Sequence, residues 1–499
     1  MGREAYQYQT NGVGGASPNI SAPRDWASGR SSFNPRLEEA IMAYQTINPT
    51  TNELVKTYPN HTEADIEAAL AAAHALYKSS WAQGPVKGRV QVLERLAELI
   101  DARAEELAKI CVQEMGKLIS DARDEVWIIA EIARLYAREA EGFLAPIEIE
   151  SGLGDAWIEH HPLGVMMVVE PWNFPYYQLM RVFAPNFAAG NPVVSKHASI
   201  VPHCASVFEE LVNEAGAPKG AWANLFITSG QVSDIIADDR IVGAAMTGSE
   251  GAGTAIATQA AKHLKKSTLE MGGNDVFVVL EDADLDKALD AGVFSRLHIS
   301  GQECICAKRF VLHEDIAEEF LARFTEAMAS VKIGDPMDED TKLGPLSSAD
   351  ASAGLAQQVE RAVAAGATLH LGGKAMDRPG NFFEPTILTN IKRENPAYFE
   401  EFFGPVAQMY VVKTDDEIVE LANDSKFGLA GAVFSKNIER AKALASRIET
   451  GAIWINTFAS TAPELPFGGV KRSGYGRELS QLGIKEFVNQ KLVLVSNAA

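Results

Sequence analysis

The feature that most constrains the fold is an alternation of short apolar runs with longer stretches of helical periodicity, and it occurs twice. The first set of runs covers residues 165–170, 192–196, 224–228, 241–247 and 275–280. The second set covers residues 309–313, 368–371, 406–412, 429–434 and 451–456. Strands that alternate with helices favour parallel, doubly wound sheets. The sequence therefore predicts two α/β domains with a cleft between them.

The segments outside this alternation carry simpler signals. Residues 1–40 are rich in Gly, Ser, Asn, Pro and Arg and have no periodicity, which is typical of a flexible leader. Between residues 62 and 143 the apolar residues follow a helical period, and Thr62 with Asp65 has the spacing of a capping box. The last apolar run, residues 491–495, is typical of a strand that pairs with a sheet edge, in this chain or on another subunit.

Composition excludes several classes of protein. The 499 residues include 66 acids and 45 bases, a formal charge of −21, whereas a nucleic-acid surface needs clustered Lys and Arg. No apolar run approaches the ~18 residues that span a bilayer. There are four cysteines and no secretory signal, so we expect a reducing compartment, the cytoplasm. Neither a nucleic acid nor a membrane is an expected partner.

Five short motifs place reactive or ligand-binding residues at the ends of predicted strands, where open α/β sheets bind ligands. They contain Asn173, Lys196, Gly248 with Ser249, Glu270, and Cys304. An amide can stabilise an oxyanion, a glutamate beside paired glycines can act as a general base, and a thiol in a glycine-containing loop can act as a nucleophile. Each motif alone also has an ordinary explanation, namely a turn, a surface lysine, an ion pair or a buried thiol. The Cys-x-Cys pair has no second cysteine pair or nearby histidine, so no metal site is predicted.

The motifs occur in the order and at the spacing of one family. From about residue 43 to its end, the chain resembles the aldehyde dehydrogenase superfamily. The resemblance rests on PWNFP at 171–175, TGS at 247–249, LEMGGN at 269–274, GQEC at 301–304, EFFGP at 401–405 and PFGGVK at 466–471. It implies an α/β fold with two doubly wound parallel-sheet domains and a small β oligomerisation flap that joins the C-terminal strand. A homodimer or homotetramer is therefore expected.

The resemblance also predicts how the chain is divided after the leader. The cofactor-binding domain is expected to comprise residues 41–146 and 163–272, and the catalytic domain residues 273–465. Residues 147–162 and 484–499 are expected to form the flap, and residues 466–483 to return to the cofactor domain.

A mechanism follows from the resemblance. Cys304 attacks an aldehyde carbonyl, the Asn173 amide and the Cys304 N–H stabilise the oxyanion, and Glu270 activates the water that releases the carboxylate. The implied cofactor contacts are Trp172, Lys196, Ser199, Gly248, Ser249, Glu401 and Phe403. Members that favour NAD commonly carry Glu where this chain has Ser199, and a hydroxyl there can donate to a 2′-phosphate. We therefore expect NADP as the preferred cofactor, with NAD as a second one, although Ser199 could also cap the next helix.

The implied substrate is a small aldehyde with a carboxylate end. The stretch QLMR at 178–181 resembles bacterial succinate-semialdehyde dehydrogenases, in which the matching Arg binds the acid end of the substrate. The implied substrate contacts are Tyr177, Arg181, Ser460, Thr461 and Phe467. Glu303 and Glu464 depart from that subgroup, and either would oppose an anionic substrate if it pointed into the funnel. Another semialdehyde, an uncharged aldehyde and a non-catalytic dinucleotide-binding protein stay open as alternatives.

Cys306 is a candidate redox partner of Cys304. The same Cys-x-Cys arrangement occurs in animal succinate-semialdehyde dehydrogenases, where it acts as a redox latch. An internal disulfide would remove the nucleophile reversibly. The alternative, which we favour slightly, is that Cys306 is a small packing residue.

Overall fold

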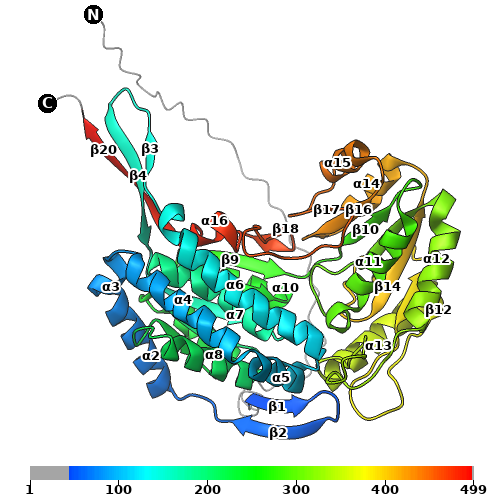
Figure 1. Ribbon diagram of the computed structural model, residues 1–499, viewed down its shortest axis with the longest axis horizontal. Coiled ribbons are helices and arrows are strands. Elements are labelled where there is room, and N and C mark those ends of the chain that lie inside the picture. The colour runs from blue at the N-terminus through cyan, green and yellow to red at the C-terminus, as the bar shows by residue number, and fades with distance from the viewer. Residues whose placement is uncertain (1–43, 497–499) are drawn as a thin grey trace, which may run out of the picture. The chain divides into compact units, whose positions relative to one another are not determined.

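Two large sheets, each flanked by helices, form the frame of residues 44–496, which are the part of the chain that the computed structural model describes (Figure 1). The leader predicted for residues 1–40 lies outside the described residues. Among residues 44–496, no helix combines the length and the apolarity that crossing a bilayer requires. The predicted α/β fold class is confirmed.

The first large sheet has six strands in the order β19-β9-β8-β5-β6-β7. Its strands are β5 (Val165–Glu170), β6 (Val193–His197), β7 (Trp222–Asn224), β8 (Ile241–Gly248), β9 (Lys266–Met271) and β19 (Gly474–Tyr475). All neighbours pair in parallel except β19, which runs antiparallel to β9. Thus residues 466–483, the predicted return segment, supply the edge strand of this sheet.

Helices cover both faces of the first sheet because its central strand is apolar on both sides. On β5, Met166 and Val168 pack into one core, and Val165 and Met167 pack into another. The first core lies under α4 (Lys87–Ala102), α5 (Ala104–Met115), α6 (Ile119–Phe143), α7 (Pro175–Ala189) and α8 (Pro202–Glu214). The second lies under α2 (Glu63–Tyr77), α9 (Ser229–Ala237) and α10 (Glu250–Lys262). Helix α2 begins with the predicted capping box of Thr62 and Asp65.

The second large sheet has seven strands in the order β12-β13-β14-β11-β10-β16-β17. They are β10 (Val276–Val279), β11 (Arg309–His313), β12 (Thr368–Leu371), β13 (Thr386–Thr389), β14 (Val406–Val412), β16 (Gly431–Phe434) and β17 (Trp454–Ile455). Only β12 is antiparallel to its neighbour. The flanking helices are α11 (Leu285–Leu297), α12 (Glu314–Ala329), α13 (Ala349–Ala364), α14 (Asp415–Asn423) and α15 (Ile438–Ala445).

Two details of the predicted alternation are wrong. Residues 275–280, grouped with the first set of strands, form β10 at the centre of the second sheet, because β10 pairs with β11 and β16. Residues 224–228 are not a strand; β7 ends at Asn224, and residues 225–228 lead into α9, whose N-cap is Thr228.

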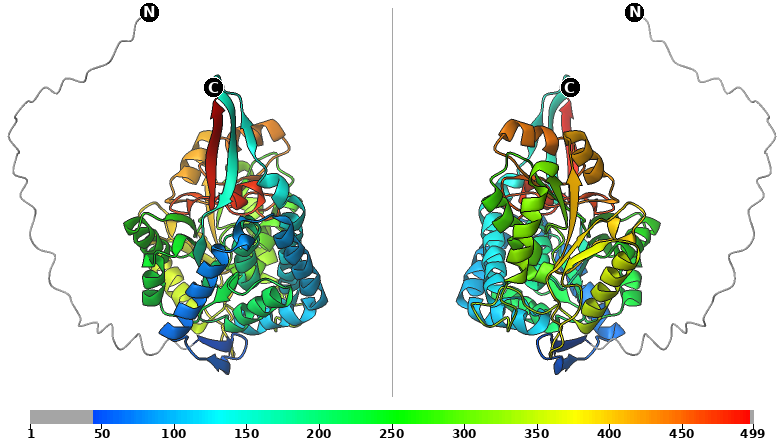
Figure 2. Two further views of the ribbon diagram at one scale, coloured as in Figure 1. Left: turned by 90° about the vertical axis from the view of Figure 1, so that its left-hand side faces the viewer. Right: turned by 90° about the vertical axis from the view of Figure 1, so that its right-hand side faces the viewer.

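A small sheet and several short elements complete the fold of the described residues. Strands β3 (Ile147–Ile149), β4 (Gly154–Pro162) and β20 (Val488–Ser496) form a separate antiparallel sheet of three strands. Figure 2 shows β4 and β20 side by side along their length. The remaining elements are β1 (Tyr44–Asn48), β2 (Glu53–Tyr58), β15 (Phe427–Gly428), β18 (Val470–Lys471), α3 (Ser80–Gln83), α16 (Ser480–Ile484), η1 (His298–Gly301) and η2 (Pro396–Tyr398).

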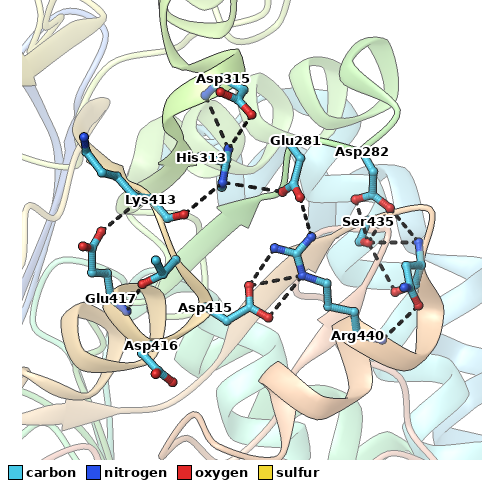
Figure 3. Close-up of polar contacts among 12 residues, drawn as sticks. Glu281, Asp282, His313, Asp315, Lys413, Asp415, Asp416, Glu417, Ser435 and Arg440 are labelled. Atoms are coloured by element: carbon cyan, nitrogen blue, oxygen red, sulfur yellow. Dashed lines mark hydrogen bonds and ion pairs between the residues drawn. The ribbon is translucent and has the colours of Figure 1, made fainter.

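The two large sheets present opposite edges to the site. Residues after β5, β8 and β9 belong to the carboxyl edge of the first sheet, where open α/β sheets bind ligands. The segments that precede β10 and β11 belong to the amino edge of the second sheet. The carboxyl edge of the second sheet instead carries a polar network in which Arg440 binds Glu281 and Asp415, and Ser435 donates to Asp282 (Figure 3).

Candidate active site

A cavity of about 540 Å³ lies where these two edges meet. Its lining contains most of the residues singled out in the sequence, namely Trp172, Asn173, Gly248, Ser249, Glu270, Cys304, Glu401 and Phe403. Lys196 and Ser199 are not among the residues that line it. The structure therefore brings the predicted nucleophile, oxyanion donor and base together with the predicted contacts to the nicotinamide half of a dinucleotide.

The nucleophile loop holds Cys304 at the cavity wall by an unusual backbone path. Ile299, Ser300 and Gly301 have positive φ values of 50°, 54° and 75° in succession. A Cβ at Gly301 would lie 2.3 Å from the backbone carbonyl carbon of Gly404, so only glycine fits where the two motifs touch. Gln302 anchors the loop, because its side chain accepts from Ser347 N at 2.9 Å.

Cys304 itself is half-buried. Burial raises the pKa of its thiol, and the nearby ammonium of Lys308 is the main charge that opposes this rise. A cationic neighbour of this kind is what a cysteine nucleophile needs, since the thiolate is the reactive form.

Asn173 lies between β5 and α7 and points at the nucleophile loop. Its Nδ2 donates to the carbonyl of Gln302 at 3.0 Å, two residues before Cys304. An amide has two N–H groups, so the second is left for an oxyanion beside the sulfur.

Glu270 is buried near the end of β9. Neither of its carboxylate oxygens has a hydrogen-bond partner among residues 44–496. Burial, and then the charge of Glu478, hold the pKa of Glu270 well above its usual range, while Arg181 and Arg477 oppose them. A carboxyl group with a raised pKa is suited to accept a proton near neutral pH.

Two further sets of contacts involve residues predicted to bind the cofactor. Ser249 is the N-cap of α10, and its hydroxyl accepts from Ala252 N at 3.4 Å. Because Ser249 lines the cavity, the cavity wall includes a helix N-terminus. The rings of Trp172 and Phe403 meet edge to face with centroids 5.8 Å apart. The suggested helix-capping role of Ser199 is wrong, because α8 has Val201 as its N-cap and no side-chain cap.

Glu401 is held between the two motifs that contain Gly273 and Cys304. Its Oε1 accepts from Gly273 N at 3.2 Å and lies 3.1 Å from Lys308 Nζ. Lys308 was not predicted from the sequence, where it reads only as the residue before a strand. Its signal was its place four residues after the nucleophile.

The predicted substrate residues contact one another, but none of them is among the residues that line this cavity, and Arg181 lines a separate small cavity with Glu478. Tyr177 Oη and Thr461 Oγ1 share a hydrogen bond of 2.7 Å, and the guanidinium of Arg181 stacks on Phe467 with 4.6 Å to the ring centroid. Ser460, Thr461 and Phe467 line one small cavity together. Arg181 is 1% exposed and already paired with Glu478, so its charge is balanced within the protein.

Glu303 and Glu464, the two acids that depart from the subgroup pattern, differ in burial and in partners. Glu303 is paired with His298, whose Nδ1 is 2.7 Å from the carboxylate. Burial disfavours the charged imidazole, but Glu303 raises the pKa of His298 above its ordinary value. Glu464 is exposed. His298 was missed in the sequence because it lies three residues before the GQEC motif, and nothing in the pattern indicates its contact with Glu303.

Cys306 is fully buried and is not among the residues that line the cavity. Its Sγ accepts from Arg296 Nη2 at 2.9 Å and donates to the Glu303 carbonyl at 2.8 Å. A disulfide with Cys304 stays a prediction, and it would require the thiol to leave these partners.

A thiol, an amide donor and a shielded carboxyl group line one cavity that has a helix N-terminus in its wall, and this set fits an oxidoreductase on an α/β frame. The chain belongs to the aldehyde dehydrogenase family, whose model matches residues 37–493.

Named relatives agree with this family. The chain is 45% identical over 450 residues to a succinate-semialdehyde dehydrogenase (NADP+) of Deinococcus radiodurans, covering 90% of this chain and 94% of that protein. It is 44% identical to a probable succinate-semialdehyde dehydrogenase (NADP+) of Synechocystis sp., covering 91% and 100%. A crystal structure of succinic semialdehyde dehydrogenase from Streptococcus pyogenes with NADP+ has a TM-score of 0.90 and 48% identity, covering 91% and 100%.

Proposed function

We propose that this protein oxidises succinic semialdehyde to succinate with NADP, through a thioester on Cys304. The observation that carries the proposal is that Cys304, Asn173 and Glu270 line the same cavity as Ser249 and Glu401. The printed names of the relatives from Deinococcus and Synechocystis support the choice of substrate and cofactor.

In the first half-reaction the Cys304 sulfur attacks the carbonyl carbon. The second N–H of Asn173 and the Cys304 backbone N–H stabilise the oxyanion, and one such donor is worth ~3 kcal/mol. NADP, when bound, would supply the hydride acceptor, and Trp172, Ser249, Glu401 and Phe403 of the cavity wall would hold it. The product on the protein is a thioester of Cys304.

In the second half-reaction Glu270 takes a proton from water, and the hydroxide attacks the thioester. The carboxylate of Glu270 must be ionised to do so, and its raised pKa makes it a strong base once ionised. The Cys304 sulfur leaves, and the acid product is released.

The cofactor contacts fit NADP. Burial lowers the pKa of Lys196 to about 8, so an anion such as a 2′-phosphate would stabilise its charged form. Ser199 lies three residues further on, where a carboxylate would repel that phosphate. Ser249 would meet the pyrophosphate, and Glu401 would hold hydroxyls of the nicotinamide ribose.

Arg181 is the proposed contact for the carboxylate end of the substrate. It lies against Tyr177 and Phe467 beside Thr461, but it shares its charge with Glu478. A structural role for the pair predicts equal effects on the KM of all aldehydes, whereas a binding role predicts an effect on the KM of acidic aldehydes alone.

The test follows reduction of NADP or NAD by absorbance with succinic semialdehyde, glutaric semialdehyde and butyraldehyde. We expect the highest kcat/KM with succinic semialdehyde and NADP, and no turnover in Cys304→Ser. Arg181→Met combined with Glu478→Gln removes both charges together. Because Arg181 also favours the Cys304 thiolate, kcat can fall for every aldehyde. The KM for succinic semialdehyde should rise at least about tenfold relative to the KM for butyraldehyde, which corresponds to the loss of one charged contact. Equal kcat/KM values for all three aldehydes would contradict the assignment.

A further inference from the structure

Lys308 is a buried cation with a complete set of partners. Its side chain is 0% exposed. Its Nζ donates to the carbonyl of Cys304 at 2.6 Å and to the carbonyl of Glu303 at 3.0 Å. The third contact is Glu401 Oε1 at 3.1 Å. An ammonium has three N–H donors, so these three contacts use all of them.

The three partners belong to two segments with different predicted roles. Two are carbonyls of the nucleophile loop, one of them on Cys304 itself. The third is the carboxylate that faces the cavity where the cofactor would bind, and its Oε2 would be only 2.1 Å from a Cβ at Gly272. Burying a lysine is costly, and these three partners compensate the lost hydration of the ammonium, so Lys308 holds the nucleophile loop and Glu401 at fixed positions.

We propose that Lys308 is a positioning residue that connects Glu401, the carboxylate expected to meet the cofactor, to the nucleophile loop. Through Lys308, a ligand bound to Glu401 changes the ionisation of the Cys304 thiol. This inference rests on the proposed function, because it assumes that Glu401 meets the cofactor and that Cys304 is the nucleophile. It adds a residue outside the motifs from which the family resemblance was drawn.

The charges around the sulfur give the coupling a definite sign. Lys308 and, more weakly, Arg181 favour the Cys304 thiolate, whereas Glu303 and Glu401 disfavour it. The ammonium of Lys308 is itself faced by Glu401, Asp275 and the Cys306 thiol, and by the like charge of Arg296. Removing the charge at 308 and removing the charge at 401 must therefore move the ionisation of Cys304 in opposite directions.

The experiment measures the rate at which iodoacetamide alkylates Cys304 in the full chain as a function of pH, with the modified peptide identified by mass spectrometry. Lys308→Met should raise the midpoint by about one pH unit or more, a tenfold slower reaction at a fixed pH below both midpoints. Glu401→Gln should lower the midpoint. Lys308→Arg, which keeps the charge, should return the midpoint toward that of the wild type.

Arg309→Met is the matched control, since Arg309 is the neighbouring buried cation. Its guanidinium donates to the carbonyls of Asn274, Leu421 and Ala422 and not to the nucleophile loop. This variant should lose thermal stability without moving the alkylation midpoint. Equal midpoints in Lys308→Met and the wild type, or shifts of the same sign in Lys308→Met and Glu401→Gln, would overturn the proposal.

The coupling is tested with 2′-phospho-ADP-ribose, which carries the ribose that would meet Glu401 but no nicotinamide ring. At a saturating concentration it should lower the midpoint of the wild type, because hydroxyl donors to Glu401 weaken its pull on Lys308. Glu401→Gln should show no such shift, and an unchanged wild-type midpoint would refute the coupling. No aldehyde is used, so these results stand apart from the turnover assay of the proposed function.

Discussion

At the residue scale, the site depends on acids that are kept away from water. Glu170, Glu270 and Glu478 are buried near one guanidinium, that of Arg181, and burial raises the pKa of each of the three above its usual range. Arg181 opposes this rise at all three carboxyl groups and Arg477 opposes it at Glu270, but burial outweighs both cations and favours the protonated acids. Glu270 therefore becomes a base only as the pH rises.

Glu270→Gln should separate the two half-reactions. The amide cannot take a proton from water, so we expect a burst of reduced cofactor followed by a steady rate reduced about 10²–10⁴-fold. In the wild type the steady rate should rise with pH, because the raised pKa delays ionisation of Glu270, and in the variant this dependence should flatten. Stopped-flow absorbance measures both phases. A variant without a burst, or with an unchanged steady rate, would contradict the role of Glu270.

Ser199→Glu should reverse the choice of cofactor. A carboxylate at this position would repel a 2′-phosphate, so the Kd for NADP should rise about 10–100-fold. The affinity for NAD should therefore increase relative to the affinity for NADP. Ser199→Ala, which only removes a hydroxyl donor, is the control, and it should raise the Kd for NADP by less than tenfold. Quenching of tryptophan fluorescence reports both affinities. A Ser199→Glu variant that keeps the wild-type ratio would exclude this position as a determinant.

At the element scale, the N-terminus of α7 fixes the position of Asn173 two residues earlier. Glu125 of α6 accepts from the backbone N–H groups of Tyr176 and Tyr177 at 2.8 and 2.9 Å. Its other oxygen is paired with Lys117, and both side chains are 0% exposed. A carboxylate from one helix therefore caps the next helix and balances a buried ammonium.

Glu125→Ala should be one of the most destabilising single changes in this part of the chain. It leaves Lys117 buried without a partner and two N–H groups without acceptors, at a cost of ~3–5 kcal/mol. The double variant Lys117→Met with Glu125→Gln should recover most of this loss. Glu131→Ala, which removes a partly exposed ion pair with Arg134 on the same helix, should cost less than about 1 kcal/mol. Urea unfolding followed by circular dichroism compares the variants. A Glu125→Ala variant as stable as Glu131→Ala would contradict this account.

Sequence patterns predicted some strands to the residue and missed others, and burial alone does not decide which, since the buried strand β13 was missed. The predicted runs 165–170, 309–313 and 406–412 match β5, β11 and β14 to the residue, because continuous apolar runs admit few other structures. The run 368–371 matches β12 to the residue as well, although β12 is a largely exposed edge strand. Strand β9 was missed, since Lys266, Ser267 and Glu270 interrupt its apolar pattern. The contacts of Lys308 and His298 could not be predicted either, because they depend on how the nucleophile loop turns back on itself.

At the scale of the whole molecule, the two large sheets use their edges differently. Arg440 and its acidic partners tie together the ends of β10, β14 and β16, so side chains already pair with one another at that carboxyl edge (Figure 3). The carboxyl edge of the first sheet carries Asn173, Gly248 and Glu270 around the cavity instead. The predicted reaction site therefore uses the carboxyl edge of the first sheet and not that of the second.

The three-stranded sheet suits an oligomer interface of the predicted kind. Leu492, Ile158 and Ile147 lie opposite one another across β20, β4 and β3, and Leu494, Ala156 and Ile149 form the next row. Residues directly opposite share a face, so these six side chains make one apolar face. Leu492 is 61% exposed, and β20 is an edge strand of the sheet (Figures 1 and 2). An exposed apolar face beside an edge strand favours contact with a second copy.

We therefore expect Leu492→Glu with Leu494→Glu to lower the oligomeric state. Two carboxylates on the apolar face would lose their hydration in any interface formed there, at a cost of several kcal/mol, enough to dissociate a homodimer or homotetramer at micromolar concentration. Lys491→Glu, on the opposite face of β20, should leave assembly intact. Sedimentation velocity gives the mass of each species. A wild type that sediments as a monomer, or a double variant that assembles as the wild type does, would show that this sheet has another role.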